Sequence, residues 1–171
     1  MLRKTLIIAI FTVVGLLVAF GHYTHRGYVS VAETDGSLRL MDHGFHLRAP
    51  WHRVTVYPVQ CREVRIEIID EGPDAKIHFD GVFYVGVSRD SIPSLHRAYR
   101  GAYVERVISP MLSEFLREYG EAFGLWDDDA GPQKVTGTVL DHVGPAAGEY
   151  GINVTNMWLK SFAVERTSGT F

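Results

Sequence analysis

Three histidines within a short stretch are the side chains of this sequence best suited to chemistry. His43, His46 and His52 lie in GSLRLMDHGFHLRAPWHRVTVYPVQ, residues 36–60. A turn between His43 and His46 would bring two rings together, but zinc and iron sites need a third protein ligand and oriented partners behind each ligand. Asp42 is a candidate for that ligand, and nothing in the sequence fixes its position. We therefore interpret the histidines as surface residues of a strand-rich region and predict no metal site.

No other segment has the pattern of a catalytic or cofactor site. The acidic run WDDDAG at residues 126–131 lacks the alternating carboxylates and the final glutamate of a calcium loop. The sequence contains no nucleophile-elbow, phosphate-loop or dinucleotide-binding motif. Its single cysteine, Cys61, excludes an internal disulfide and any zinc site built on paired cysteines. We predict a protein that is not an enzyme and that needs no cofactor.

The composition indicates a globular chain with no affinity for nucleic acid. Of its 171 residues, 46% are hydrophobic and 22% are charged, as in ordinary folded domains. The formal net charge of −3 offers no broad attraction for a polyanion. A mildly basic sector, interpreted as a mixed charged surface near a membrane, contains Arg39, Arg48, Arg53, Arg62 and Arg65.

An uncharged run, TLIIAIFTVVGLLVAFGHY at residues 5–23, is the most distinctive segment. At about 1.5 Å per residue it predicts a helix of roughly 28 Å, close to the ~30 Å hydrocarbon core of a bilayer. We predict a single-pass anchor within residues 1–26. Arg3 and Lys4 favour a cytoplasmic N-terminus with the remaining chain on the extracytoplasmic side. The residues expected to contact lipid or its interface are Leu6, Ile7, Ile8, Phe11, Leu16, Leu17, Phe20, Tyr23 and Trp51.

A cleaved signal peptide is the alternative interpretation of the same segment. The basic start, the apolar stretch and the sequence AFG at residues 19–21 fit a signal with a cleavage site. The mature chain would then be a secreted or periplasmic ligand-binding module, with Trp51, Trp126 and Trp158 near a ligand groove. The apolar run is long for a signal peptide, and this length favours the anchor.

The first half of the remaining chain has the alternating pattern of β-strands. We expect four or five strands in residues 28–88, forming one compact antiparallel sheet. Turn-forming residues at 35–36 and 71–74 separate these strands. Asp80 and Gly81 indicate a bulge or a tight turn inside a longer apolar run.

Helices and one closing strand are expected in the second half. Residues 104–119 carry apolar side chains at three- and four-residue intervals, which predicts a helix interrupted at Pro110. Residues 134–144 are only a weak helix candidate, because Gly137 and several β-branched residues disfavour a helix. The final strand is expected in YGINVTNMWLKSFAV, residues 150–164.

The order of these elements over residues 27–163 resembles the band 7 or SPFH family, which includes prohibitins, stomatins and bacterial membrane-protease modulators. The most specific part is Y-x-ERV-x-x-P-x-x-x-E-x-L, and a Gly-x-His-x-x-x-Pro element and an Asp-Gly pair before an alternating strand also match. The positions that carry the resemblance are Gly44, His46, Pro50, Asp80, Gly81, Tyr103, Glu105, Arg106, Pro110, Glu114 and Gly151.

The resemblance implies an α+β fold: a single N-terminal transmembrane helix, then an SPFH-like domain of antiparallel strands packed by two or three helices. Residues 164–171 would form a flexible tail. Members usually continue into a coiled coil that drives assembly, whereas this chain stops at Phe171. We therefore do not expect large cages unless a longer partner supplies the missing helix. The resemblance implies self-association or a hetero-oligomer with a longer SPFH protein. The implied function is a membrane-anchored, non-enzymatic scaffold that binds membrane lipid, associates laterally, and organises membrane proteins or modulates a membrane protease.

Overall fold

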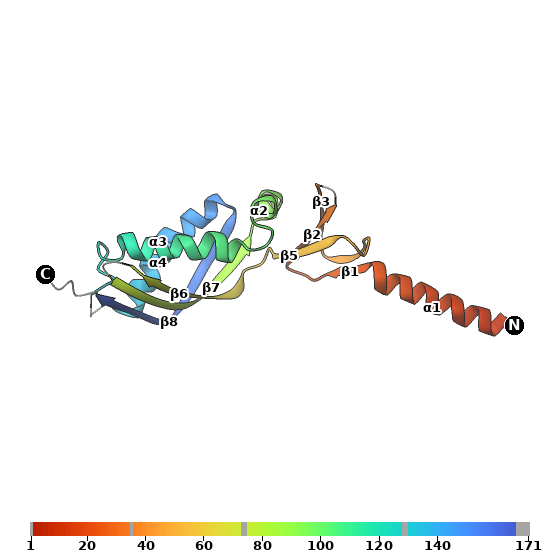
Figure 1. Cartoon of the computed structure of the whole chain (residues 1–171), viewed down its shortest axis with the longest axis horizontal. Helices are drawn as coiled ribbons and strands as arrows, with labels where there is room; N and C mark the ends of the chain where they lie inside the picture. The colour runs from red at the N-terminus through yellow and green to blue at the C-terminus, as the bar shows by residue number, and fades with distance from the viewer. Residues whose placement is uncertain (1, 35, 73–74, 128–129, 167–171) are drawn as a thin grey trace. The chain divides into compact units, whose positions relative to one another are not determined.

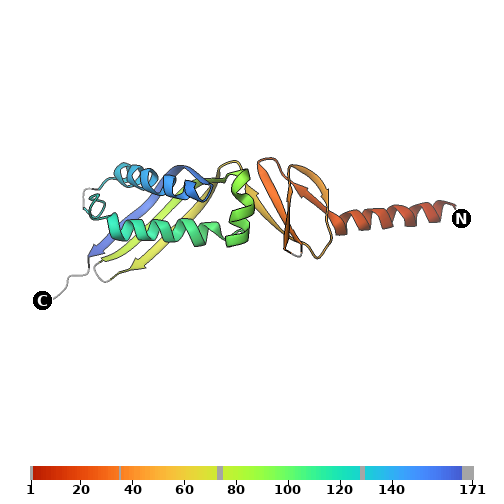
Figure 2. The same ribbon diagram turned by 90° about the horizontal axis from the view of Figure 1, so that it is seen from above.

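The chain forms two compact units, Met1–Tyr57 and Pro58–Phe171, in a computed structural model (Figures 1 and 2). The structure describes residues 2–34, 36–72, 75–127 and 130–166; side chains are described from residue 7 onward, except that of Ile8. The expected turn residue Asp35, parts of the 71–74 turn and of the acidic run, and residues 167–171 of the tail lie outside the described residues.

The first unit consists of one helix and two small sheets. The strands β1 and β4 pair antiparallel, with His22 opposite His46, while β2 lies between β3 and β5 in the second sheet. Buried Val29, Val31 and Met41 form its apolar core. In chain order the elements are α1 (Leu2–Phe20), β1 (Gly21–Thr24), β2 (Tyr28–Thr34), β3 (Ser37–Met41), β4 (Gly44–Leu47) and β5 (Arg53–Pro58).

The helix α1 ends earlier than the uncharged run does. Phe20 is its last residue, and the next four residues form β1, so Tyr23 lies on a strand rather than on the helix. The backbone N–H of Arg48 donates to the carbonyl oxygen of Phe20 at 2.7 Å, which satisfies one of the free carbonyls at the helix end.

In the part of the chain that the structure describes, no helix is both long and apolar enough to cross a membrane.

The second unit is an antiparallel sheet with helices on one face. The sheet has the order β6-β7-β8, and α3 and α4 lie side by side over it (Figures 1 and 2). Ile66, Phe79 and Phe83 of the sheet are buried, as are Leu112 of α3 and Val139 of α4. Its elements are β6 (Arg62–Glu71), β7 (Ala75–Val87), α2 (Ile92–Tyr99), a π-turn (Val104–Ile108), α3 (Ser109–Tyr119), α4 (Pro132–Glu149) and β8 (Ile152–Arg166).

The strands expected in residues 28–88 do not form one sheet. They are divided among three sheets, because β1 pairs with β4 while β6 and β7 join the C-terminal β8. The bulge expected at Asp80 and Gly81 is present as a register shift between β7 and β8. Lys160 has no residue of β7 opposite it at this shift, and Thr155 has none at a second shift, between Tyr84 and Val85. Both bulges therefore place their extra residue in β8.

The helix expected at residues 104–119 forms, but Pro110 changes its first turns. Pro110 has no N–H to donate to the carbonyl four residues earlier. The chain accommodates this with a π-turn, in which the N–H of Ser109 donates to the carbonyl of Val104. Val107, Leu112 and Leu116 are buried as the apolar stripe requires, whereas Tyr119 at the end of the stripe is exposed.

The segment that the sequence marks as a weak helix is the longest helix of the second unit. α4 has 18 residues and carries Val135, Val139, Val143 and Ala147 at four-residue intervals, all of them buried. This stripe packs against β8 and α3. Burial of that face outweighs the poor intrinsic propensity of Gly137 and its β-branched neighbours.

Gly151, one of the positions that carry the resemblance, is required by the backbone. Its φ is +74°, and a Cβ added to it would overlap the side chain of Ser91. Gly151→Ala is expected to destabilise the full chain by about 1–2 kcal/mol from the left-handed backbone, with a steric cost in addition. Denaturant unfolding measures the loss. Adding Ser91→Gly removes the overlap and should recover only the steric part of the lost stability. A Gly151→Ala variant as stable as the wild type would contradict the prediction.

Candidate functional site

Exposed apolar side chains cover the N-terminal helix. Seven of the positions between Ile10 and Val18 that carry large apolar side chains are exposed, and Val18 is 78% exposed. They include adjacent positions such as Ile10 and Phe11, which point in different directions around the helix. Of the predicted lipid-facing residues, Ile7, Phe11, Leu16 and Leu17 are exposed, Phe20 is half-buried, and the side chains of Leu6 and Ile8 lie outside the described residues.

The two residues predicted to lie at the interface are both exposed. Trp51 is 77% exposed and follows the exposed Pro50 in a turn, and half of the Tyr23 side chain is accessible on β1. The hydroxyl of Tyr23 lies 3.3 Å from Nε2 of His43, and the two rings pack edge to face. Phe45, opposite Tyr23 on β4, and Leu47 are exposed as well. The end of the first unit that follows α1 is therefore rich in exposed aromatic and apolar groups.

His43, His46 and His52 do not converge. Nε2 of His46 is within 2.6 Å of the Asp42 carbonyl oxygen, and His43 contacts Tyr23. His52 lines a cavity beside α1. Among the described side chains, no three His, Cys, Asp or Glu residues come close enough together to hold a metal ion.

A buried polar cluster connects β1 to β2, and its side chains are hydrogen-bonded to one another. The hydroxyl of Thr24 donates to the Ser30 hydroxyl oxygen at 2.9 Å, and His22 Nε2 lies 2.9 Å from the same oxygen. Thr24 and Ser30 are both buried. These contacts fix the direction in which the chain leaves the helix, which is a structural role.

The family-motif residues of the second unit divide into a buried part and an exposed part. Tyr103 is buried, and that burial raises the pKa of its phenol. Glu105, Arg106, Pro110 and Glu114 are exposed on the π-turn and α3. The same motif thus anchors the helix to the core and leaves its charged side chains exposed. Gly44 begins β4 with a positive φ of 130°.

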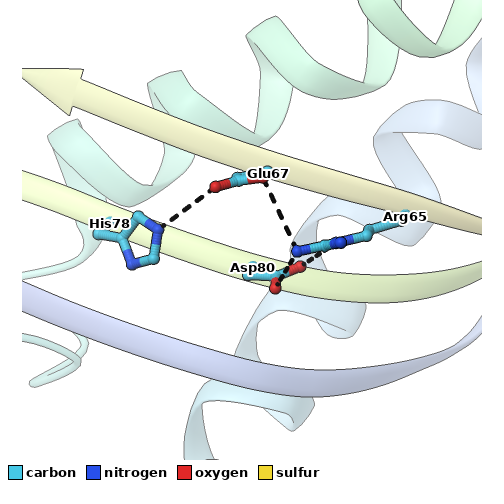
Figure 3. A network of polar contacts seen from close by, with 4 residues as sticks. All are labelled: Arg65, Glu67, His78 and Asp80. Atoms are coloured by element: carbon cyan, nitrogen blue, oxygen red, sulfur yellow. Dashed lines mark hydrogen bonds and ion pairs between the residues drawn. The ribbon is translucent and has the colours of Figure 1, made fainter.

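The face of the sheet that the helices leave open carries a polar network (Figure 3). Arg65 of β6 donates two hydrogen bonds to the Asp80 carboxylate of β7, at 2.9 and 2.8 Å. Glu67 lies 3.8 Å from Arg65 and 3.7 Å from His78. The two bonds from Arg65 hold the pKa of Asp80 below the ordinary carboxyl value. Gly81, next to Asp80, is buried and lies against the Phe79 ring.

Neutralising Asp80 is expected to destabilise the chain only above acidic pH. A carboxylate with a lowered folded-state pKa contributes stability above the unfolded pKa of about 4, and loses it as the pH falls through the folded value. Asp80→Asn should therefore unfold more easily than the wild type at pH 7, with the gap closing at pH 3. The gap is small in size because Arg65 is more than half exposed. Melting curves at both pH values test this; a gap of equal size at pH 3 counts against the assigned cause.

The open face also presents one large aromatic ring. Trp158 of β8 is 73% exposed and lies opposite Val82 of β7, close to the polar network. Exposed aromatic groups bordered by hydrogen-bonded charges are typical of protein contact surfaces. Trp158 and Trp126 line separate cavities, so these two tryptophans do not form the shared ligand groove of the alternative interpretation.

The fold fits an SPFH domain: mixed α+β, with antiparallel sheets and helices packed on one of them. The model of the SPFH domain / Band 7 family matches residues 14–166, and the protein belongs to this family. No curated protein matches the chain significantly. Members of the family commonly form membrane scaffolds, typically oligomerise and associate with membranes, and are generally not enzymes.

The sequence alone predicts neither the polar network of Arg65 and Asp80 nor the exposed ring of Trp158 on the same face. Arg65 was one member of a basic sector and Asp80 a turn residue, and no local signal pairs them. Their contact depends on the register of β6 and β7, in which Arg65 lies opposite Val82. The exposure of Trp158 could have been predicted from strand alternation, because its apolar neighbours Met157 and Leu159 share the opposite face of the strand.

Proposed function

We propose that this protein is a membrane-anchored, non-enzymatic scaffold that associates laterally and organises membrane proteins or modulates a membrane protease. The observation that carries the proposal is the exposure of apolar side chains on adjacent positions of α1, from Ile10 to Val18. A helix that is apolar on all sides needs an apolar environment, which water does not supply. A lipid bilayer supplies it.

The orientation follows from the residues at the two ends of the uncharged run. Arg3 and Lys4 precede it, which favours a cytoplasmic N-terminus with the chain after α1 on the extracytoplasmic side. Three exposed aromatic rings follow α1, those of Tyr23, Phe45 and Trp51. Aromatic side chains are enriched at the level of lipid headgroups. The basic residues before the uncharged run and the aromatic rings after α1 support the same orientation.

Lateral association is supported by the open face of the β6-β7-β8 sheet. Trp158 of β8 supplies a large exposed ring there, and Ile69 of β6, on the other side of β7, is also exposed. Proteins confined to a membrane surface meet at high effective concentration, so that weak contacts between such faces suffice. The exposed charges of Glu105, Arg106 and Glu114 provide a second surface, on which a larger SPFH protein or a protease could dock.

Membrane attachment is tested by fractionating cells that express the C-terminally tagged full chain. We expect the protein in the membrane pellet, resistant to alkaline carbonate, with an intact N-terminus by mass spectrometry. Recovery of a chain shortened near residue 21 in the soluble fraction would support the secreted binding module instead. Flotation on a density gradient separates membrane-bound protein from aggregates.

Lateral association is tested in intact membranes with a photo-crosslinking amino acid at position 158. We expect adducts with a second copy or with a larger protein, which mass spectrometry identifies. The matched control places the same group at Tyr150, an exposed aromatic position after α4. Adducts to lipid alone at position 158, or equal adducts at both positions, would contradict a protein contact at the open face.

A further inference from the structure

A cavity of about 480 Å³ lies within the first unit, between the C-terminal half of α1 and the strands that follow it. Its apolar wall includes Leu16 and Leu17 of α1, Met41 of β3 and Leu47 of β4. The wall is continuous with the exposed apolar surface of α1, because Leu16 and Leu17 belong to both. The cavity therefore extends a surface that needs an apolar environment.

Basic side chains form the polar part of the same cavity. Arg39, Arg48 and His52 line it, and none of the described residues that line it is acidic. Nη1 of Arg48 donates to the His52 carbonyl oxygen at 3.1 Å, while Nε of Arg48 is buried and has no hydrogen-bond partner. A buried donor without an acceptor is costly, and a guanidinium binds phosphate oxygens through pairs of N–H groups.

The backbone places Arg48 at the end of the helix. Arg48 is tied to α1 by its N–H bond to the Phe20 carbonyl oxygen. Val13, also in the cavity wall, lies seven residues before Phe20, which corresponds to about 10 Å along the helix axis. A cation at the helix end and an apolar wall over the next ~10 Å match the arrangement of phosphate and acyl chain in a phospholipid.

We propose that this cavity binds one anionic phospholipid, with its phosphate at Arg39, Arg48 and His52 and its acyl chain along Leu16, Leu17 and Met41. The inference rests on the proposed membrane attachment, which brings lipid to this end of α1. Free phosphate would leave the apolar wall uncovered. The uncharged run of a second copy's α1 would bring no anion to these basic side chains.

The test uses full-length protein in nanodiscs that contain phosphatidylglycerol, phosphatidylcholine or both. Native mass spectrometry of the released protein is expected to show one retained phosphatidylglycerol, at least tenfold enriched over phosphatidylcholine in the mixed discs. Arg48→Gln and Arg39→Gln should each reduce that enrichment severalfold, whereas Arg48→Lys should keep part of it. Arg53→Gln, a nearby exposed arginine outside the cavity lining, is the matched control and should leave it unchanged.

The outcomes separate this inference from the proposed function. Protein that enters nanodiscs but retains both lipids equally overturns the phospholipid site and leaves the anchor standing. Displacement of the lipid by millimolar inorganic phosphate identifies a free-anion site and also overturns it. Protein that does not enter nanodiscs overturns the anchor itself. If Arg48→Gln does not fold by circular dichroism, the exposed Arg39→Gln decides, and unchanged enrichment in that variant overturns the site.

Discussion

Replacing both Ile10 and Val14 with aspartate is expected to move the protein from the membrane fraction to the soluble fraction. Both residues are exposed apolar positions one helical turn apart near the middle of α1. An aspartate at the centre of a membrane helix costs about 2.5–3.5 kcal/mol, so two cost about 5–7 kcal/mol. That free energy corresponds to a change of roughly 10⁴-fold in the partition between membrane and water.

Carbonate extraction followed by density-gradient flotation measures this change and separates insertion from aggregation. Leucine at the same two positions is the matched control and should leave the protein in the floating fraction. Ile69→Asp, a charge at an exposed apolar position of the sheet, should do so as well. A double aspartate variant that still floats and resists carbonate would show that α1 is not what holds the protein to the membrane.

Truncating Phe83 is expected to cause the largest loss of stability in the second unit. Its ring is 0% exposed on the central strand β7 and packs against Phe79 with centroids 6.0 Å apart. Replacing a buried phenylalanine by alanine costs about 3–5 kcal/mol, because the lost burial is accompanied by a cavity. For a chain of this size the melting temperature should fall by roughly 10 °C. Thermal and denaturant unfolding of the detergent-solubilised full chain measure both quantities.

The neighbouring Trp158 supplies the matched control for this prediction. It lies on β8 opposite Val82, the residue next to Phe83, and is mostly exposed. Trp158→Ala should change stability by no more than about 0.5 kcal/mol, although it deletes a larger ring. Equal losses of stability in the two variants would contradict the structure, in which Phe83 is buried and Trp158 is exposed.

Strong periodicity and motif order made part of this fold predictable. The apolar stripe of residues 104–119 and the alternation in 150–164 correspond to α3 with its π-turn and to β8. α4 was underestimated, because intrinsic propensity disfavours Gly137 while packing rewards the stripe from Val135 to Ala147. Propensity is local, whereas the burial that stabilises α4 depends on β8 and α3.

Strand partners could not be predicted from alternation. The pattern shows which residues share a face, and it says nothing of which strand lies beside which. The basic sector shows the consequence. Arg65 is joined to Asp80, whereas Arg39 and Arg48 line the cavity beside α1, and only the topology makes this distinction. The region that became the candidate lipid site is divided in sequence between α1 and the strands that follow it.

The two bulges of β8 limit how the protein can polymerise. β8 is an edge strand, and its unpaired Thr155 and Lys160 divide it into runs of three, four and six residues. Each bulge bends the strand and increases its twist, so an incoming straight strand can match only a short run. Continuous edge-to-edge pairing of β-sheets between molecules is thereby disfavoured, even at high local concentration. A contact between two copies at this edge would therefore have to rely on side chains rather than on a long run of backbone hydrogen bonds.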